Sequence, residues 1–139
     1  MSTTPKDAGA AAHILIVDDE RHNRQLLEVM LGAEGYVLTT ACSGDEALAA
    51  IAQQAPNLIL LDVMMPGMDG YQVVAKIKAN AATSNIQVIL LTALDDRSSR
   101  SYGLSAGAAD FLTKPVDRLE LLARVKLLLD RTAEMDAAR

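Results

Sequence analysis

The sequence has few aromatic residues and almost no cysteine. It contains no tryptophan, one phenylalanine and three tyrosines among 139 residues, so its core must be built mainly from aliphatic side chains. The single cysteine, Cys42, excludes an internal disulfide and favours a reducing, cytoplasmic setting. We find no apolar run near the roughly 20 residues of a membrane-spanning helix and no signal peptide before the first apolar run, so no membrane association is expected.

Positive charge is also in short supply. Lysine and arginine number 13 against 18 aspartates and glutamates, which gives a net charge of −5. Such a surface repels a phosphate backbone, so we do not expect this domain to bind nucleic acid. Half of the residues are hydrophobic, which excludes a disordered chain. We expect one folded domain over residues 13–131, a flexible tail over 1–12, and a helical extension or linker over 132–139.

Short apolar runs alternate with helical patterns along the chain. The runs predict strands at residues 13–18, 37–41, 58–62, 87–92 and 110–113. Helices are predicted at residues 23–32, from Ser43 to before Pro56, at 71–79, at 96–106, and from residue 116 or 117 onward. This alternation predicts an α/β fold of the flavodoxin-like, doubly wound kind, a five-stranded parallel sheet of order 2-1-3-4-5 with helices on both faces. The helix over 96–106 has little apolar content and should be loosely held.

Three aspartates stand at the ends of two predicted strands. Asp18 and Asp19 follow the apolar run 14–17, and Asp62 follows the apolar run 58–61. In the order 2-1-3-4-5 these two strands are neighbours, so their acids should converge on one edge of the sheet. Close carboxylates repel one another, and a hard divalent cation such as Mg²⁺ relieves that repulsion. The pattern predicts a metal site suited to chemistry on an anionic group.

A threonine and a lysine stand at the ends of the next two strands. Thr92 ends the fourth strand, and Lys114 follows the fifth. A hydroxyl can donate to one phosphoryl oxygen, and an ammonium can neutralise another. Taken singly, Thr92 is more simply read as a helix cap and Lys114 as a solvated surface residue. Together with the acids at the same edge, they predict a phosphate site that contains a metal.

Four segments of the chain carry a resemblance to a known family. They are residues 17–19, 62–70, 91–93 and 113–115. In this order and at this spacing they resemble the receiver domain of two-component response regulators, and the likeness covers residues 13–131. The stretch around Asp62 and residues 109–115 also resemble receivers that precede cyclic-dinucleotide output domains.

The resemblance implies a phosphoacceptor and a set of metal ligands. Asp62 would accept a phosphoryl group from a phosphohistidine on a histidine kinase or a histidine phosphotransfer protein. Asp19 and Asp62 would bind Mg²⁺ directly, with Mn²⁺ as a substitute, and Asp18 would bind it through water. The backbone carbonyl of Met64 would supply a further ligand. No organic cofactor is implied, and the protein would catalyse only its own phosphoryl transfer and dephosphorylation, so it would not be an enzyme in the ordinary sense.

The resemblance also implies a conformational switch. Thr92 and Lys114 would hold the phosphoryl oxygens, and the bond between Lys114 and Pro115 would be cis, which would aim the lysine inward. As Thr92 moves toward the phosphoryl group, Phe111 would turn inward, and the face formed by the fourth helix, fifth strand and last helix would change. That face would control an output domain, a downstream protein or a phosphorylation-dependent homodimer. Because Met64 and Leu94 are apolar and cannot orient a water molecule, we expect a long-lived phosphoryl group.

Two other functional classes are open to a sheet of this order. Phosphatases that resemble haloacid dehalogenases place a second acid two residues after the nucleophile, where this chain has Met64. A nucleotide- or flavin-binding module needs a glycine-rich phosphate loop after the first strand, where Asp19 and Glu20 would instead repel a phosphate. The sequence does not identify the kinase, the signal, the output or the oligomeric state.

Overall fold

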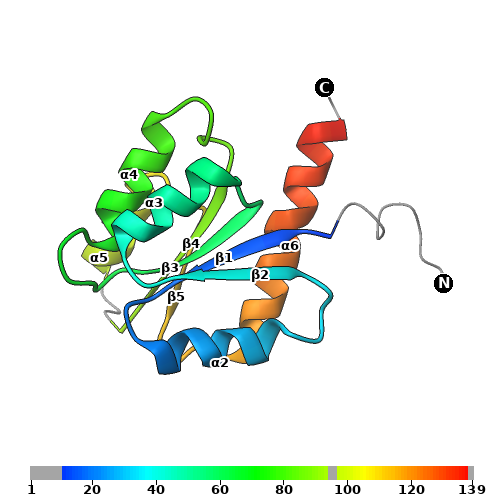
Figure 1. Cartoon of the computed structure of the whole chain (residues 1–139), viewed down its shortest axis with the longest axis horizontal. Coiled ribbons are helices and arrows are strands. Elements are labelled where there is room, and N and C mark those ends of the chain that lie inside the picture. Colours follow the sequence, from blue (N-terminus) through cyan, green and yellow to red (C-terminus); the bar gives the residue numbers. More distant parts are fainter. Residues whose placement is uncertain (1–10, 94–96, 138–139) are drawn as a thin grey trace.

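A computed structural model of the chain describes residues 11–93 and 97–137. Five parallel strands form one sheet, in the order β2-β1-β3-β4-β5 (Figure 1). Their bounds are β1 His13–Val17, β2 Val37–Ala41, β3 Leu58–Asp62, β4 Gln87–Thr92 and β5 Asp110–Thr113. This sheet confirms the predicted fold class and strand order. The order could be predicted because right-handed crossovers leave few other arrangements for alternating strands and helices.

Helices cover both faces of the sheet (Figure 1). Their bounds are α2 Arg21–Leu31, α3 Gly44–Gln53, α4 Gly70–Ala79, α5 Arg97–Ser105 and α6 Arg118–Ala137. Helices α2 and α6 lie on one face, and α3, α4 and α5 lie on the other. The predicted helix starts differ by one or two residues from the observed ones, and at some helices a capping side chain sets the start. At α6, for example, the Asp117 carboxylate accepts a hydrogen bond of 2.9 Å from the backbone N–H of Glu120.

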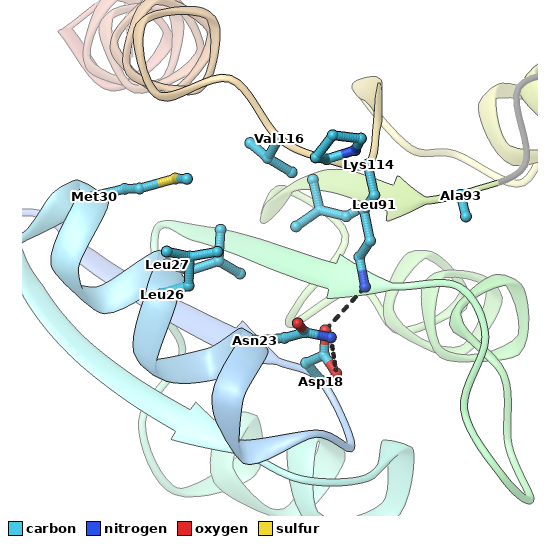
Figure 2. A pocket seen from close by; sticks show the side chains of 10 residues that line it. Asp18, Asn23, Leu26, Leu27, Met30, Leu91, Ala93, Lys114 and Val116 are labelled. Atoms are coloured by element: carbon cyan, nitrogen blue, oxygen red, sulfur yellow. Dashed lines mark hydrogen bonds and ion pairs between the residues drawn. The ribbon is translucent and has the colours of Figure 1, made fainter.

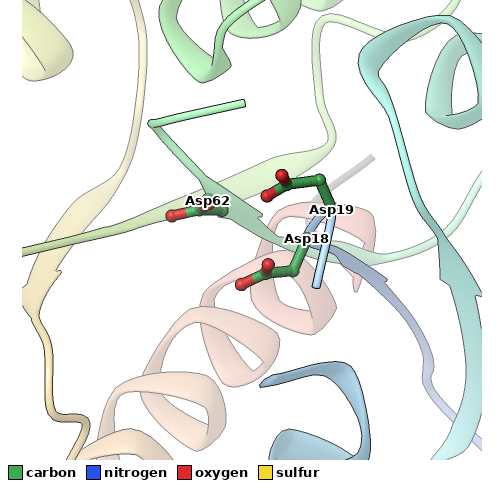
Figure 3. Close-up of side chains that lie close together, drawn as sticks. All are labelled: Asp18, Asp19 and Asp62. Atoms are coloured by element: carbon green, nitrogen blue, oxygen red, sulfur yellow. The ribbon is translucent and has the colours of Figure 1, made fainter. Parts of the chain in front are cut away.

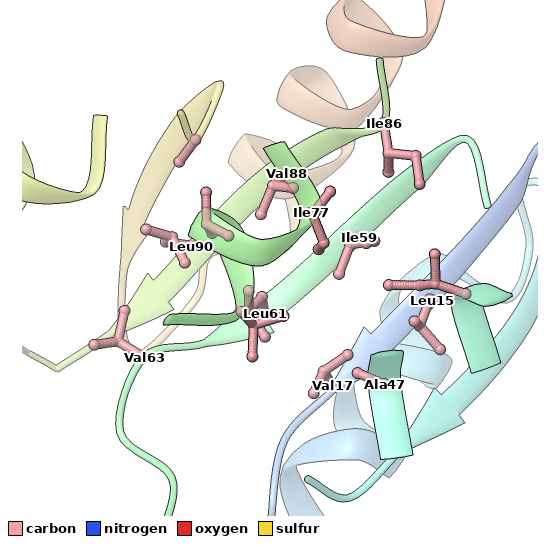
Figure 4. Packing of buried hydrophobic residues seen from close by; sticks show 14 of the residues in the cluster. Leu15, Val17, Ala47, Ile59, Leu61, Val63, Ile77, Ile86, Val88 and Leu90 are labelled. Carbon is pink, nitrogen blue, oxygen red and sulfur yellow. The ribbon is translucent and has the colours of Figure 1, made fainter. Parts of the chain in front are cut away.

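Two separate hydrophobic clusters lie on the two sides of the sheet. Successive strand residues point to opposite faces, so Leu15 packs toward α3 and α4 whereas Ile14 packs toward α2 and α6. Figure 4 shows the first cluster, in which Ile59, Leu61 and Leu90 contribute from β3 and β4. Burial on both faces explains why the strand sequences are continuously apolar rather than alternating.

Helix caps fix where α3 and α4 begin. The Ser43 hydroxyl accepts from the Glu46 N–H over 3.1 Å, as its sequence pattern predicts, while the Glu46 carboxylate accepts from the Cys42 N–H over 2.8 Å. At α4 the Asp69 side chain accepts from the Gln72 N–H, and the Gln72 side chain accepts from the Asp69 N–H. This second capping box was not predicted, and it places the start of α4 one residue earlier than expected.

The helices differ greatly in how firmly they are anchored. Helix α4 buries four residues against the sheet, whereas in α5 the buried residue is Gly103. A Cβ atom at Gly103 would lie 2.7 Å from Leu90 Cδ1, so the absence of a side chain lets α5 approach the sheet. Helix α5 therefore rests on the sheet with little apolar burial, as its sequence suggested. Among the described residues, no helix combines the length and the apolar content that crossing a membrane requires.

Candidate functional site

The register of β1 and β3 brings the three predicted aspartates together. Val17 pairs with Leu61, so Asp18, Asp19 and Asp62 emerge side by side at the carboxyl edge of the sheet. Each offers a carboxylate oxygen, and these oxygens all lie within 4.8 Å of one another (Figure 3). Asp18 and Asp62 are buried, while Asp19 is exposed. The cluster therefore has a buried floor and a side open to solvent.

Lys114 lies between two of these carboxylates. Its Nζ is 3.1 Å from Asp18 Oδ2 and 3.0 Å from Asp62 Oδ1. The Lys114–Pro115 bond is cis, as expected, and the Lys114 backbone N–H donates to the Thr92 carbonyl over 2.7 Å. Thr92 itself is fully buried, one residue beyond the β4 position that pairs with Asp62. The structure thus gathers acids, hydroxyl and ammonium at one edge of the sheet.

The electrostatics of the site are set by burial and by crowding of like charge. Burial raises the pKa of Asp62, and Lys114 opposes this by hydrogen bonding and by charge, but Asp18 and Asp19 raise the pKa further. Burial by itself would lower the pKa of Lys114, but the hydrogen bond and charge of Asp62, with those of Asp18, raise it above its ordinary value. Lys114 is therefore firmly cationic, and an ionised Asp62 is under electrostatic strain.

The donor set fits a hard divalent cation. Three carboxylates face one ammonium, so the cluster keeps an excess of negative charge. Carboxylate oxygens are the ligands that Mg²⁺ prefers, and the exposed side leaves room for the waters that Mg²⁺ retains. Asp18, Asp19 and Asp62 are the residues that would hold it. The backbone carbonyl of Met64 stays a predicted fourth ligand, and the Met64 side chain is exposed.

The backbone around Asp62 is shaped by a close approach of α4. A Cβ atom at Gly70 would lie 2.6 Å from the carbonyl oxygen of Asp62 and 2.8 Å from Val63 Cα, so glycine is required here. The Gly70 N–H donates to the Val63 carbonyl over 2.9 Å, which closes the loop between β3 and α4. Gly67, with a φ of 75°, provides the turn within that loop. These contacts hold the backbone carrying Asp62 in one position.

Three further residues support the site and were not predicted from the sequence. The Glu20 N–H donates to Asp18 Oδ1 over 2.9 Å, and Arg24 donates to the Asp18 carbonyl over 2.8 Å. The Asn23 amide donates to Glu20 Oε1 over 2.8 Å and lies 3.5 Å from Asp18 Oδ1. A signal was available, because polar side chains in the first turn of a helix that follows a strand project toward the end of that strand.

Two cavities adjoin this cluster. One, of about 230 Å³, lies over the acids and is lined by Asp19, Glu20, Asn23, Asp62, Met64, Ala93 and Lys114. The other, of about 410 Å³, lies between α2 and the segment that follows β5 (Figure 2). Its walls are apolar side chains that include Leu26, Met30 and Val116, and Asp18 and Lys114 form its polar end. The site is therefore continuous with an apolar groove on the surface.

The predicted switch residue Phe111 is already buried, at 2% exposed, with the Arg100 guanidinium 5.2 Å from its ring centroid. A switch through Phe111 would therefore change its packing inside the core rather than bring the ring in from solvent. Leu94, which was predicted to affect the lifetime of the phosphoryl group, lies outside the described residues.

Comparisons with known proteins give a consistent result. Residues 14–126 match the family described as the response regulator receiver domain. The chain is 49% identical over 134 residues to the response regulator PleD of Caulobacter vibrioides, which covers 92% of this chain and 30% of PleD. It is 43% identical over 128 residues to the response regulator MprA of Mycobacterium bovis, which covers 92% of this chain and 55% of MprA. The solved structure of the chemotaxis protein CheY4 of Vibrio cholerae matches with a TM-score of 0.81 at 30% identity, over 86% of this chain and 99% of that one.

Proposed function

Because the chain belongs to the response regulator receiver domain family, we propose that Asp62 accepts a phosphoryl group from a phosphohistidine on a histidine kinase or histidine phosphotransfer protein. The observation that carries this proposal is the placement of the Lys114 ammonium 3.0 Å from the Asp62 carboxylate. That carboxylate is buried, and Asp18 and Asp19 lie beside it, so its pKa is raised. A nucleophilic carboxylate with a fixed cation beside it is arranged for reaction with a phosphoryl group.

The chemistry assigns one task to each side chain. An oxygen of the Asp62 carboxylate attacks phosphorus in line, and the bond from phosphorus to the donor imidazole nitrogen breaks. The imidazole, protonated on its other ring nitrogen before it leaves, departs as a neutral histidine, and an acyl phosphate is left on Asp62. The Lys114 ammonium moves its contact from the carboxylate to a phosphoryl oxygen, and the Thr92 hydroxyl donates to another. A divalent cation, when bound by the three aspartates, neutralises charge on the phosphoryl oxygens. The chain modifies its own side chain and turns over no separate substrate.

The groove beside the site fits the docking of a protein donor. It shares Asn23, Ala93 and Lys114 with the cavity over the acids, so a helix seated on it would lie next to Asp62. Leu26 is 47% exposed and Val29 on the same helix is also exposed, which offers apolar surface to a partner helix. The chain spans 30% of PleD, so an output domain or a separate downstream protein belongs to the proposal as well.

The switch face in this proposal is formed by α5, β5 and α6. Phosphorylation at Asp62 draws Thr92, which lies at the start of the segment that leads to α5. Since α5 buries so little against the sheet, a small gain in contacts at the phosphoryl group can shift its position. Such a shift would be passed to an output domain, a downstream protein or a second copy of the chain.

The direct test is labelling with acetyl phosphate and with a phosphorylated histidine kinase in the presence of Mg²⁺. We expect up to one phosphoryl group per chain on the unmodified protein, none on Asp62→Asn, and none after addition of a chelator. Asp130→Asn, which changes an exposed aspartate on α6, should label normally. Labelling of Asp62→Asn at the level of the unmodified chain would refute the assignment. Continuous turnover of a simple phosphoester would favour the phosphatase class instead.

A further inference from the structure

Glu20 and Asn23 form a hydrogen-bonded pair at the mouth of the acidic pocket. Both line the cavity of about 230 Å³ that lies over Asp19 and Asp62. Asn23 Nδ2 is 2.8 Å from Glu20 Oε1 but 3.5 Å from Asp18 Oδ1. Since hydrogen bonds from nitrogen to oxygen are good to about 3.2 Å and weak beyond, Glu20 is the main partner of the Asn23 amide.

The pair is held from the backbone as well. The Glu20 N–H donates to Asp18 Oδ1, and this fixes the residue before the first turn of α2, where Asn23 lies. A glutamate in solvent samples many rotamers, and ordering it costs side-chain entropy. Here the Asn23 amide donates to the Glu20 carboxylate, and Glu20 lines the cavity over the acids. The arrangement orders a charged group that would otherwise move freely.

We propose that Asn23 is a positioning residue that holds the Glu20 carboxylate over the pocket, where it accepts hydrogen bonds from the water shell of the divalent cation. The inference rests on the proposed function, because it concerns the same cation site. Mg²⁺ keeps several of its waters in protein sites, so acceptors outside the direct ligands contribute to its affinity. The cavity is also lined by Met64, whose thioether is only a weak acceptor, and by Ala93, whose methyl group accepts no hydrogen bond. Glu20 is the carboxylate on this wall that is not assigned to direct metal binding or to the reaction.

Two simpler roles for Glu20 can be separated from this one. A residue before the first turn of a helix often caps it, but the Glu20 side chain makes no capping hydrogen bond to α2. A surface acid also attracts any cation weakly at long range, an effect that falls off with distance and with salt. An acid within α2, Glu28, serves as the control for this general effect. Glu28 lies eight residues further along the chain, about 12 Å along the helix axis at 1.5 Å per residue.

The test is a Mg²⁺ titration of the unphosphorylated full chain, followed by amide NMR shifts at fixed ionic strength. Glu20→Gln keeps an oxygen for the Asn23 amide but removes the charge, and Glu20 is exposed, so the fold should be retained. We expect this variant to raise the Kd for Mg²⁺ about tenfold, at the lower end of what outer ligand partners contribute. Glu28→Gln, which removes the same charge from α2, should change the Kd by less than about twofold.

Asn23→Ala tests whether Asn23 acts through Glu20. We expect it to raise the Kd about threefold, and we expect the double variant with Glu20→Gln to bind no more weakly than Glu20→Gln, since neighbouring residues that act together are not additive. Urea unfolding in the presence of a chelator should give similar midpoints for all variants. A purely structural role would move those midpoints and leave the Kd ratios unchanged.

The outcomes separate this inference from the proposed function. If the unmodified chain does not bind Mg²⁺, the proposed function is overturned along with the inference. If it binds Mg²⁺ but Glu20→Gln matches Glu28→Gln, the role of Glu20 is refuted while the phosphoacceptor site stands. Independent, multiplying effects of the two substitutions would refute the claim that Asn23 works through Glu20.

Discussion

Asp62 is buried and lies close to two other acids, and both conditions disfavour its charged form. The charged form is the one that binds a cation, so folding and the proposed function place opposite demands on this one side chain. The residue is 5% exposed, and burial together with Asp18 and Asp19 raises its pKa despite the contact with Lys114. A site selected for folding alone would not place three carboxylates so close together. The arrangement makes sense if a cation and a phosphoryl group are to be bound there.

Replacing Asp62 by asparagine should therefore stabilise the fold when Mg²⁺ is absent. A raised pKa means that the folded state favours the protonated form of Asp62. The contribution of Asp62 to the free energy of unfolding is therefore fully present below the unfolded pKa of about 3.9, and it is lost as pH rises through the folded pKa. We expect Asp62→Asn to raise the free energy of unfolding at pH 7 on the order of 1 kcal/mol, with a smaller gain near pH 4. Urea unfolding at several pH values measures this.

The control for that measurement is Asp130→Asn. Asp130 lies on α6 in an exposed ion pair with Lys126 at 3.6 Å, which contributes little to stability. This variant should leave the free energy of unfolding nearly unchanged at every pH. A destabilised Asp62→Asn would mean that the pairing with Lys114 outweighs burial and repulsion.

Among the elements, α5 contacts its neighbours partly through aromatic side chains. The rings of Tyr71 and Tyr102 meet edge to face, with centroids 4.7 Å apart, and the Tyr71 hydroxyl donates to the Ser99 carbonyl over 3.3 Å. On the inner side, Gly103 packs against Leu90. Tyr71 belongs to α4, which is firmly packed, so it links the weakly held helix to a stable one. The Tyr71 contacts therefore help to hold α5 in place.

Removing the Tyr71 ring should loosen α5 selectively. An aromatic pair contributes about 0.5–1.5 kcal/mol beyond burial, and the hydrogen bond adds a similar amount, so Tyr71→Ala should speed hydrogen exchange of α5 amides about tenfold. Amides of β3 and β4, which exchange through global unfolding, should change much less. NMR-detected native-state exchange resolves the two regions.

Tyr102→Phe provides the comparison, because it keeps the ring that meets Tyr71. In Tyr102→Phe, the α5 amides should exchange hydrogen at nearly the rate seen in the unmodified chain. If Tyr71→Ala and the unmodified chain exchange alike throughout α5, then the Tyr71 contacts do not hold this helix and other contacts must.

At the scale of the whole molecule, the acidic cluster would couple the binding of a cation to folding. Asp18 and Asp19 come from the end of β1 and Asp62 from the end of β3, 43 residues or more apart in sequence, so the cluster exists only when the sheet is formed. A ligand that binds the folded state alone stabilises it according to its concentration relative to Kd. Mg²⁺ should therefore report on the integrity of the entire sheet.

Adding Mg²⁺ should raise the thermal unfolding midpoint. At a concentration 100 times the Kd, the expected stabilisation is about 2.7 kcal/mol. Asp19→Asn removes an exposed carboxylate of the cluster and should reduce this response, while addition of a chelator should abolish it. Na⁺ at matched ionic strength is the control. Equal stabilisation by Na⁺ and Mg²⁺ would show screening of charge rather than a specific site.

The sequence by itself determined the strands, their order and the predicted site residues. Continuous apolar runs specify strands buried on both faces, and the resemblance assigned roles to residues such as Asp62 and Lys114 at the ends of those runs. The bounds of β2, β3, β4 and β5 agree with the predicted ones, since polar or turn-forming residues end each run.

The tertiary structure decided what depends on side-chain direction and on distance. The Glu20–Asn23 pair, the burial of Phe111 beneath Arg100 and the close approach of Gly70 to Asp62 each join groups whose geometry no linear pattern specifies. The same holds for the balance of burial and charge that raises the pKa of Asp62, because desolvation arises only once the chain has closed around the group.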